Sequence, residues 1–271
     1  MKPISTFVGC LLASLIFAAG AVMFAPSTAM AGEAEAETAD SDRYKGDFRQ
    51  MRVVPGQMKY RYPFTDHRGF FSIGPHIGAP GVFGDVSGIN GATDVSVTSA
   101  DAVENLDLAT GIFVEAGYRH VGVSVDFTHF DLSTDEVERN AEGAFDLQKF
   151  ITNVRVNWTY EPLENLELGP VAGVRHIYLR SATSESWADP LVGLHGRYTL
   201  ADLFFLSYYA DVGGIAFGSD ISFQAYGALG ITTNKVDFEL GYRHLYVDFE
   251  SDDLEYDMST TGPVFSTIFR F

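Results

Sequence analysis

One histidine in the sequence has neighbours that could support catalysis. His129 is followed closely by Asp131 and Ser133, and a histidine beside an acid and a hydroxyl could serve an acyl hydrolase or an aspartate–histidine protease. No motif of either class surrounds His129, so we predict no catalytic residue. The other histidines on predicted strands are His76, His176, His195 and His244.

A run of acidic residues near the C-terminus could bind a metal ion. Asp252, Asp253, Glu255 and Asp257 offer the oxygen ligands that Ca²⁺ and Mg²⁺ prefer, but they lack the spacing and the glycine of an EF-hand loop. We therefore predict no metal site and no cofactor. Weak association of these acids with divalent cations is kept as an alternative. No glycine-rich phosphate loop opens a helix, and no nucleic-acid-binding module is visible.

A larger set of charged residues occupies every second position in apolar segments. Val236, Phe238 and Leu240 alternate with Asp237 and Glu239, which is the period of a strand. One face is apolar throughout, and the other mixes charge with glycine. An apolar face turned outward and a small, charged face turned inward are typical of a transmembrane β-barrel. The inward charged residues are Glu115, Asp126, Arg155, Arg175, Arg197, Asp211, Asp237, Glu239, Arg243 and Arg270.

The same alternation predicts an all-β fold, a closed antiparallel up-and-down barrel of about ten strands, with eight as the alternative. Short turns near residues 120, 162, 201 and 234 alternate with longer loops at 79–107, 131–143, 181–190, 214–220 and 248–261. We expect irregularities at Pro75 and at Gly169-Pro170. The strands are predicted at 69–78, 108–118, 121–130, 145–160, 166–179, 191–198, 203–213, twice between 221 and 249, and at 262–271.

The inward charges are balanced, with five acids against five arginines. Buried charges need partners, so we predict a plug of salt bridges in which the arginines pair across the lumen. A narrow, water-filled pore lined by the same residues is the alternative. Side chains just fill a barrel of eight strands, and ten strands make it only slightly wider.

The last strand and the aromatic residues carry a resemblance to a known family. The chain ends in Phe271, preceded at alternate positions by Phe269 and Phe265, which resembles the C-terminal signal of Gram-negative outer-membrane β-barrel proteins. The resemblance is to small OmpA- or OmpW-like barrels of the porin superfamily and covers about residues 65–271. It implies that an assembly machinery reads these phenylalanines. An aromatic girdle is expected from Tyr118, Trp158, Tyr160, Tyr178, Tyr198, Tyr208, Tyr242 and Phe271.

The N-terminal region is predicted to lie outside the barrel domain of residues 65–271. Lys2, an apolar run and Ala29-Met30-Ala31 predict a signal peptide over residues 1–31, and residues 32–64 read as a flexible acidic periplasmic leader. Cys10, the only cysteine, would leave with the signal peptide, which excludes disulfides from the mature chain. The remaining 17 basic and 36 acidic residues give a net charge near −19. A protein this acidic would be repelled by the phosphates of a nucleic acid.

We therefore expect an exported, non-enzymatic barrel in the outer membrane of a Gram-negative bacterium. Its partners would be membrane lipid and lipopolysaccharide, and its role would be structural or would depend on surface interactions of the acidic loops. A small diffusion channel and a lipid- or peptide-hydrolysing enzyme are the alternatives. A shared scaffold does not decide among them, because such barrels differ in their loops and lumens. The oligomeric state is not predicted.

Overall fold

The computed structural model describes one compact unit, which lies between Arg61 and Phe271. The predicted signal peptide and acidic leader fall outside the described residues, as do Ser133 and Asp253. The described residues are 69–88, 91–105, 107–132, 147–163, 165–180, 184–201, 203–214, 218–252 and 254–271.

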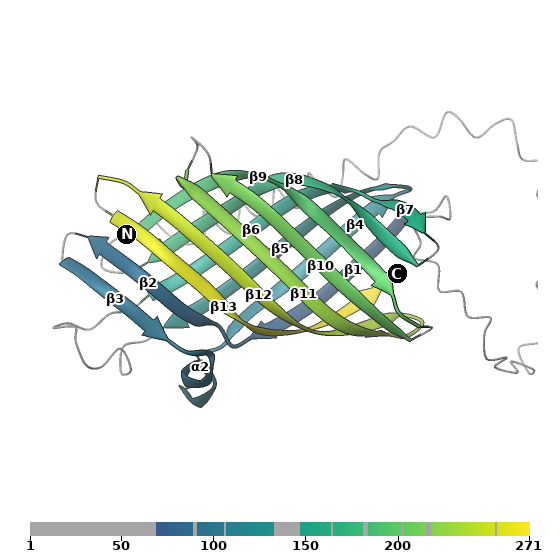
Figure 1. Ribbon diagram of the computed structural model, residues 1–271, viewed down its shortest axis with the longest axis horizontal. Helices are drawn as coiled ribbons and strands as arrows, with labels where there is room; N and C mark the ends of the chain where they lie inside the picture. The colour runs from purple at the N-terminus through teal and green to yellow at the C-terminus, as the bar shows by residue number, and fades with distance from the viewer. Residues whose placement is uncertain are drawn as a thin grey trace, which may run out of the picture. The chain divides into compact units, whose positions relative to one another are not determined.

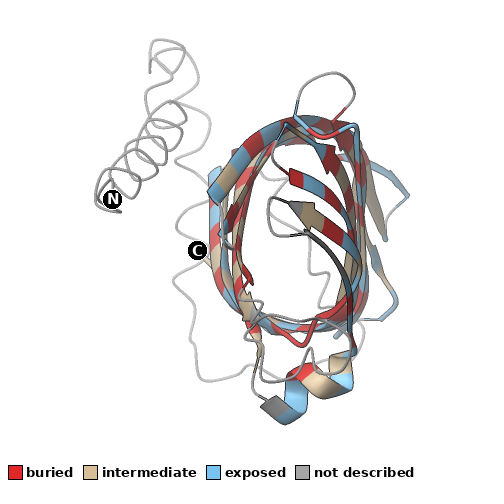
Figure 2. Cartoon of the chain, turned by 90° about the vertical axis from the view of Figure 1, so that its left-hand side faces the viewer, coloured by how far each residue is buried: buried red, intermediate tan, exposed pale blue. Residues whose placement is uncertain are grey.

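Ten antiparallel strands form a closed barrel, each paired with the next one along the barrel and the last paired back to the first (Figures 1 and 2). This confirms the predicted up-and-down fold, and the eight-strand alternative is wrong. Among the described residues, no helix has the length and apolar character needed to cross a membrane. The barrel strands are β1 (Gly69–Gly78), β4 (Ala109–Tyr118), β5 (Val121–Leu132), β6 (Leu147–Trp158), β8 (Leu166–Arg180), β9 (Ser184–Thr199), β10 (Phe204–Gly214), β11 (Ile221–Thr232), β12 (Val236–Glu250) and β13 (Leu254–Arg270).

The two ends of the barrel differ in how the strands are connected. We call the end at which β1 begins and β13 ends the terminal end, and the opposite end the distal end. At the terminal end, β4 and β5 are joined through Arg119 and His120, and Arg119 adopts a positive φ of 56° in this tight turn. The predicted short turn near residue 120 is therefore present.

The predicted loop at 79–107 contains two strands that extend the barrel wall, followed by a short helix. β2 (Gly81–Gly88) follows β1 and also pairs with β13, and β3 (Gly91–Val97) pairs with β2. The register does not change between the two strands, because Gly78 lies opposite Val264 and Gly81 lies opposite Thr261. β1 and β2 therefore form one arm that follows β13 along its length.

A short helix, α2 (Ser99–Asn105), connects β3 to β4 and lies outside the ring of strands in Figure 2. It begins with a capping box, in which the Asp101 amide donates to Thr98 Oγ1 at 3.2 Å and the Thr98 amide donates to Asp101 Oδ2 at 2.8 Å. Hydrogen bonds from the Thr98 hydroxyl and amide lower the pKa of Asp101 below its usual value. This helix was not predicted from the sequence.

Several strands are longer than predicted, and all of them extend at the distal end. β12 and β13 are joined by residues 251–253 alone, so most of the predicted loop at 248–261 is strand. β9 begins at Ser184, so the predicted loop at 181–190 is also mostly strand. A short strand, β7 (Tyr160–Leu163), pairs with β8 where a turn near 162 was expected.

Neither predicted irregularity shifts the register of the barrel strands, although the ladder between β1 and β13 is interrupted at Gly74 and Pro75. β1 pairs with β4 without a shift from Gly69–Tyr118 to Gly78–Ala109, a stretch that includes Pro75. β8 pairs with β9 without a shift through Gly169 and Pro170. The bulge in β8 was expected because Ile177 and Leu179 fell on the inner side. They do lie inside and are buried, so the inner face itself becomes apolar there.

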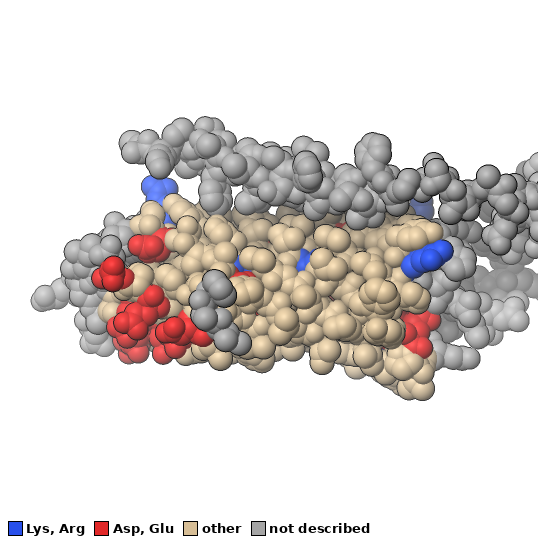
Figure 3. Space-filling view, turned by 90° about the horizontal axis from the view of Figure 1, so that it is seen from above, with Lys and Arg blue, Asp and Glu red and all other residues tan. Residues whose placement is uncertain are grey.

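The distal half of the barrel reverses the usual distribution of apolar and charged residues. On the outer face of β12, Phe238 and Leu240 are exposed near the terminal end, whereas Glu250 is exposed at the distal end. On the inner face, Asp237 at the terminal end gives way to Phe249 at the distal end. Figure 3 shows acidic residues gathered at the distal end and few charged residues on the middle of the visible face. The distal half therefore projects beyond the apolar band of the barrel.

The apolar band predicts the effect of an outward charge. Leu240, with 65% of its surface exposed, lies in this band. Leu240→Arg should therefore make folding into lipid vesicles less favourable by about 2–4 kcal/mol. Glu250→Arg, on the same face of β12 at the distal end, should have little effect. Equal urea-unfolding midpoints for the two variants would contradict the assignment of the band.

Candidate functional site

All ten charged residues expected inside the barrel lie on its inner face, where small residues make room for large ones. A Cβ atom on Gly117 would collide with the ring of Phe70, and one on Gly230 would collide with the ring of Phe205. An inward glycine on one strand thus leaves room for the inward phenylalanine ring of the neighbouring strand. The ten residues are Glu115, Asp126, Arg155, Arg175, Arg197, Asp211, Asp237, Glu239, Arg243 and Arg270.

The innermost ion pair joins Arg175 and Asp211, whose side chains are both completely buried. Arg175 Nη2 lies 2.6 and 2.7 Å from the two oxygens of Asp211, and its other donors reach Asn153 Oδ1 and Ser222 Oγ, each at 3.0 Å. The hydroxyl of Tyr209 also donates to Asp211. A buried charge is tolerated when its remaining hydrogen-bonding groups are also satisfied, as they are for Arg175.

A second group of charges surrounds Asp126 on β5. Arg243, from β12 on the other side of the lumen, lies 3.3 Å from Asp126 Oδ2, and Arg155 on the neighbouring β6 lies 3.8 Å away. His76 Nε2 is 3.7 Å from Asp126 and 3.1 Å from the hydroxyl of Thr128, which also accepts a hydrogen bond from Arg243. Strands β1, β5, β6 and β12 are thereby joined through the lumen.

A third group lies near the terminal end around Asp237. Arg197 and Arg270 each lie 2.9 Å from one of its two oxygens, and Thr232 donates a hydrogen bond of 2.6 Å. The guanidinium of Arg197 stacks on Phe205, with 3.3 Å between its carbon and the ring centroid. These contacts cross-link β9, β11, β12 and β13.

The pairing differs from the predicted balance of five against five. Three aspartates take all five arginines, whereas Glu115 accepts from Asn157 Nδ2 at 3.1 Å and Glu239 accepts from the hydroxyl of Tyr226 at 3.0 Å. The predicted list of inward charged residues left out two charged residues and all the neutral partners, several of which the alternation already placed on the inner face. The residues left out are Ser222, Gln224, Asn153, Asn157, Thr128, Thr232, Tyr209, Tyr226, Lys149 and Glu167.

A cavity of about 200 Å³ separates the Asp237 group from the Arg175 group. Its lining includes Glu115, Glu167 and Glu239 together with Arg155 and Arg243. The Arg243 side chain keeps 22% of its surface accessible even though it lies inside the barrel, which shows that it borders open space. The lumen is therefore filled by side chains at the Arg175 and Asp237 groups and contains open space between them.

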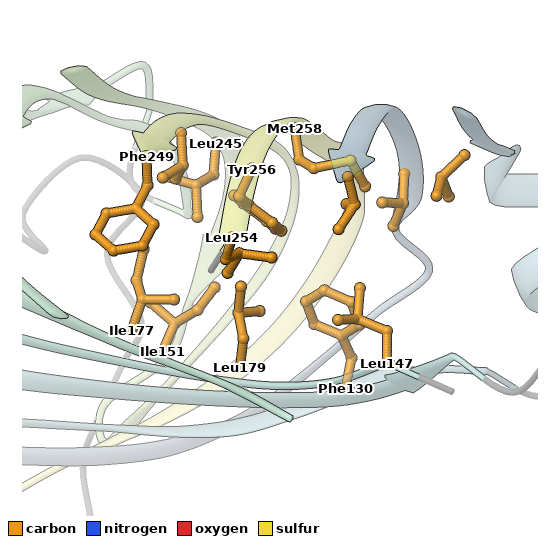
Figure 4. Packing of buried hydrophobic residues seen from close by; sticks show 14 of the residues in the cluster. Phe130, Leu147, Ile151, Ile177, Leu179, Leu245, Phe249, Leu254, Tyr256 and Met258 are labelled. Carbon is orange, nitrogen blue, oxygen red and sulfur yellow. The ribbon is translucent and has the colours of Figure 1, made fainter. Parts of the chain in front are cut away.

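The distal half of the lumen is filled by an apolar core (Figure 4). Trp187 stacks on Phe249 with 4.0 Å between ring centroids, and Tyr256 lies against the same indole. Lys149 marks the boundary between core and charged lumen, and its ammonium donates to the hydroxyl of Tyr256 at 2.8 Å. Other members of the core are Val82, Val86, Val95, Val97, Ala109, Phe130, Leu147, Ile151, Ile177, Leu179, Leu245, Val247, Leu254 and Met258.

The structure does not assemble the other candidate sites. His129 lies on the outer face of β5, with its ring centroid 4.4 Å from that of Phe150, so it is part of an aromatic patch. Glu255 accepts a hydrogen bond of 2.9 Å from Ser87, and Asp252 and Asp257 are exposed. Within the described ranges, no three histidine, cysteine or acidic side chains are grouped to hold a metal ion.

The eight residues expected in the aromatic girdle lie on the outer face at different heights. Tyr178 is near the distal end of β8, where it contacts Phe150, while Tyr208 and Tyr242 occur within β10 and β12. Tyr118, Trp158, Tyr160, Tyr198 and Phe271 lie near the terminal end. Phe265 and Phe269, of the proposed assembly signal, are also exposed on the outside.

The buried ion pair predicts a large effect of single substitutions. Arg175→Met should destabilise the barrel by about 3–5 kcal/mol, because Asp211 would then be a buried charge without a partner. Adding Asp211→Asn should recover much of the loss. Arg180→Met, at an exposed position on the same strand, should change stability by less than about 0.5 kcal/mol. Equal urea-unfolding midpoints for Arg175→Met and Arg180→Met would contradict this account.

No family model matches the sequence, and no curated protein matches it. Among solved structures, the outer membrane protease OmpT from Escherichia coli is similar, with a TM-score of 0.52, 8% identity, and coverage of 74% of this chain and 97% of that one. The translocator domain of autotransporter NalP from Neisseria meningitidis (12% identity, 76% and 90% coverage) and Neisserial surface protein A (13%, 74% and 97%) have TM-scores of 0.38 and 0.33. The chain thus has the fold of an outer-membrane β-barrel protein.

Proposed function

We propose that this protein is a non-enzymatic component of the outer membrane of a Gram-negative bacterium, with a structural and surface-interaction role and a lumen closed to solutes. The observation that carries the proposal is the apolar core inside the distal half. A channel needs a continuous polar path, and here packed aromatic and aliphatic side chains interrupt it.

Two consecutive barriers support a closed lumen. A solute passing from the distal end would first have to separate the stacked rings of Trp187 and Phe249. It would then meet Arg175, which is fully buried and makes five hydrogen bonds to side chains from three other strands. Opening either barrier would expose apolar surface or leave a charge without its partner, and both changes are costly.

The distal surface supports the interaction role. Six of its eight exposed acidic side chains stand on paired strands or on α2, which fix their positions better than flexible loops would, and Asp220 and Asp252 lie in the adjoining turns. We place this end outside the cell, surrounded by lipopolysaccharide, with membrane lipid against the apolar band. Divalent cations would bridge its carboxylates to the lipopolysaccharide phosphates. The exposed acids are Asp85, Asp94, Glu104, Asp220, Glu250, Asp252, Glu255 and Asp257.

The chain ends fit the same proposal. Residues 1–31 would direct export and be cleaved, and residues 32–64 would remain in the periplasm. Phe265, Phe269 and Phe271 would be read by the barrel-assembly machinery. All three rings are exposed on the outer face, where such a reader could reach them.

A small diffusion channel is the second candidate, and the cavity of about 200 Å³ is the observation that favours it. It would require the apolar core to open. A hydrolytic enzyme has less support. His129 packs against Phe150 on the outer face, and the similarity to the protease OmpT, at 8% identity, extends to the fold alone.

Conductance separates the closed barrel from the channel. The wild-type protein in planar lipid bilayers should give a flat current trace, because the core blocks the distal half. A variant that removes both barriers, with Trp187, Phe249 and Tyr256 changed to Ser and Arg175 and Asp211 changed to Ala, should show conducting events that the wild type lacks. Regular, steady current steps from the wild type would overturn the closed lumen and establish the channel.

Labelling of single cysteines tests which end faces the outside. Glu250→Cys at the distal end should react with a membrane-impermeant maleimide on intact cells. Lys235→Cys, in the exposed turn at the terminal end, should react only after the outer membrane is permeabilised. The mature chain would contain no other cysteine. Labelling of Lys235→Cys on intact cells would show that the orientation is reversed.

A further inference from the structure

The cavity inside the barrel is lined by buried polar atoms that make no hydrogen bond within the described part of the protein. They are Nε and Nη2 of Arg155, Nε of Arg243 and Oδ1 of Asn157. All three residues line the cavity. Arg155 and Asn157 are more than nine-tenths buried. Buried polar groups in native proteins are nearly always hydrogen-bonded, so the cavity is suited to a polar guest.

The two arginines present a fixed, positively charged surface to the cavity. The guanidinium of Arg155 stacks on Tyr209 at 4.3 Å from the ring centroid, and that of Arg243 lies 5.8 Å from the centroid of Tyr226. Both arginines share one carboxylate, that of Asp126. Two positive charges facing one negative charge leave an excess of positive charge and free N–H donors, which is an arrangement that binds a carboxylate.

The same cavity contains acids that no arginine neutralises by an ion pair. Glu115 accepts its hydrogen bond from the neutral Asn157, and Glu239 accepts from the neutral Tyr226. Glu167 also lines the cavity and is attracted by Arg197 and Arg270, both of which form their ion pairs with Asp237. These carboxylates would be satisfied by an ammonium group, which donates three hydrogen bonds.

We propose that this cavity binds a small zwitterion of the α-amino acid class. Its carboxylate would accept from the free N–H groups of Arg155 and Arg243, and its ammonium would donate to the three glutamates. A simple cation would leave the arginine donors without an acceptor, and a simple anion would leave Glu115 and Glu239 with neutral hydrogen-bond donors only. A volume of about 200 Å³ is below the roughly 300–1,000 Å³ of pockets for drug-sized ligands, which fits a small guest. The apolar core closes the distal side, so the guest would enter from the terminal end, past the Asp237 group.

Calorimetric titration of the folded, full-length mature barrel in detergent micelles tests the proposal. The probes are L-alanine and L-glutamine, and acetate and ethylammonium serve as controls that each carry one of the two charges. The amino acids should give saturable heats and raise the melting temperature, and the controls should give neither. No saturable heat at up to about 10 mM amino acid would overturn the proposal. Equal binding of acetate or ethylammonium would show a site for a single charge and would also overturn it.

Two conservative variants tie the binding to the cavity. Glu167→Gln keeps the shape of the side chain and breaks no ion pair, and it should weaken L-glutamine binding about tenfold. Ser207→Ala removes a hydroxyl that lines the cavity and takes part in no ion pair, which provides a second variant expected to fold normally. Glu255→Gln, on the distal outer surface, should bind as the wild type does. Unchanged binding in both cavity variants would contradict the location of the site. The conductance experiment is independent, because a closed distal half is compatible with either result.

Discussion

The closed hydrogen-bonded sheet imposes the constraint on which the rest of this structure depends. Within lipid every backbone donor and acceptor must be paired inside the protein, and a closed sheet achieves this with no free edge. Once the strands are paired without shifts, successive residues must alternate between the inside and the outside. The polarity of each side chain then has to match its surroundings at that height along the barrel, which are lipid, water or the barrel interior.

That constraint explains why the inner and outer faces change character together along β12. Where the surroundings are lipid, Leu240 lies outside and Asp237 lies inside. Further along the same strand the surroundings become aqueous, and Phe249 lies inside while Glu250 lies outside. The distal half therefore resembles a soluble β-barrel with its own hydrophobic core, continuous with a membrane-spanning half whose centre is polar. Burial of the core stabilises the projecting strands, which have no lipid to support them.

The fold was largely predictable from the sequence, because the strand period and the turns are local properties. Strand lengths were not, since the prediction assumed that the apolar face stays on the outside. Beyond the lipid this assumption fails, and acidic segments such as 248–261 were therefore assigned to loops. For the same reason Ile177 and Leu179 were interpreted as a bulge. The inward charged residues were identified by alternation, but their partners were not. Whether Arg243 meets Asp126 depends on the stagger between strands on opposite walls, which no local pattern encodes.

The arm formed by β1 and β2 has a consequence for how the barrel closes. β13 is the last strand of the described barrel, and its partner along the whole seam is a segment from the beginning of the barrel domain. Closure thus joins the two parts of the domain that are most distant in sequence along one continuous seam, which spans both the lipid-embedded and the projecting halves. Because one register serves both halves, inserting one residue between Gly78 and Gly81 would place the projecting half out of phase with the embedded half. Insertions and deletions in related sequences are therefore expected at the tips of the distal hairpins, where they do not change the register between β13 and the arm formed by β1 and β2.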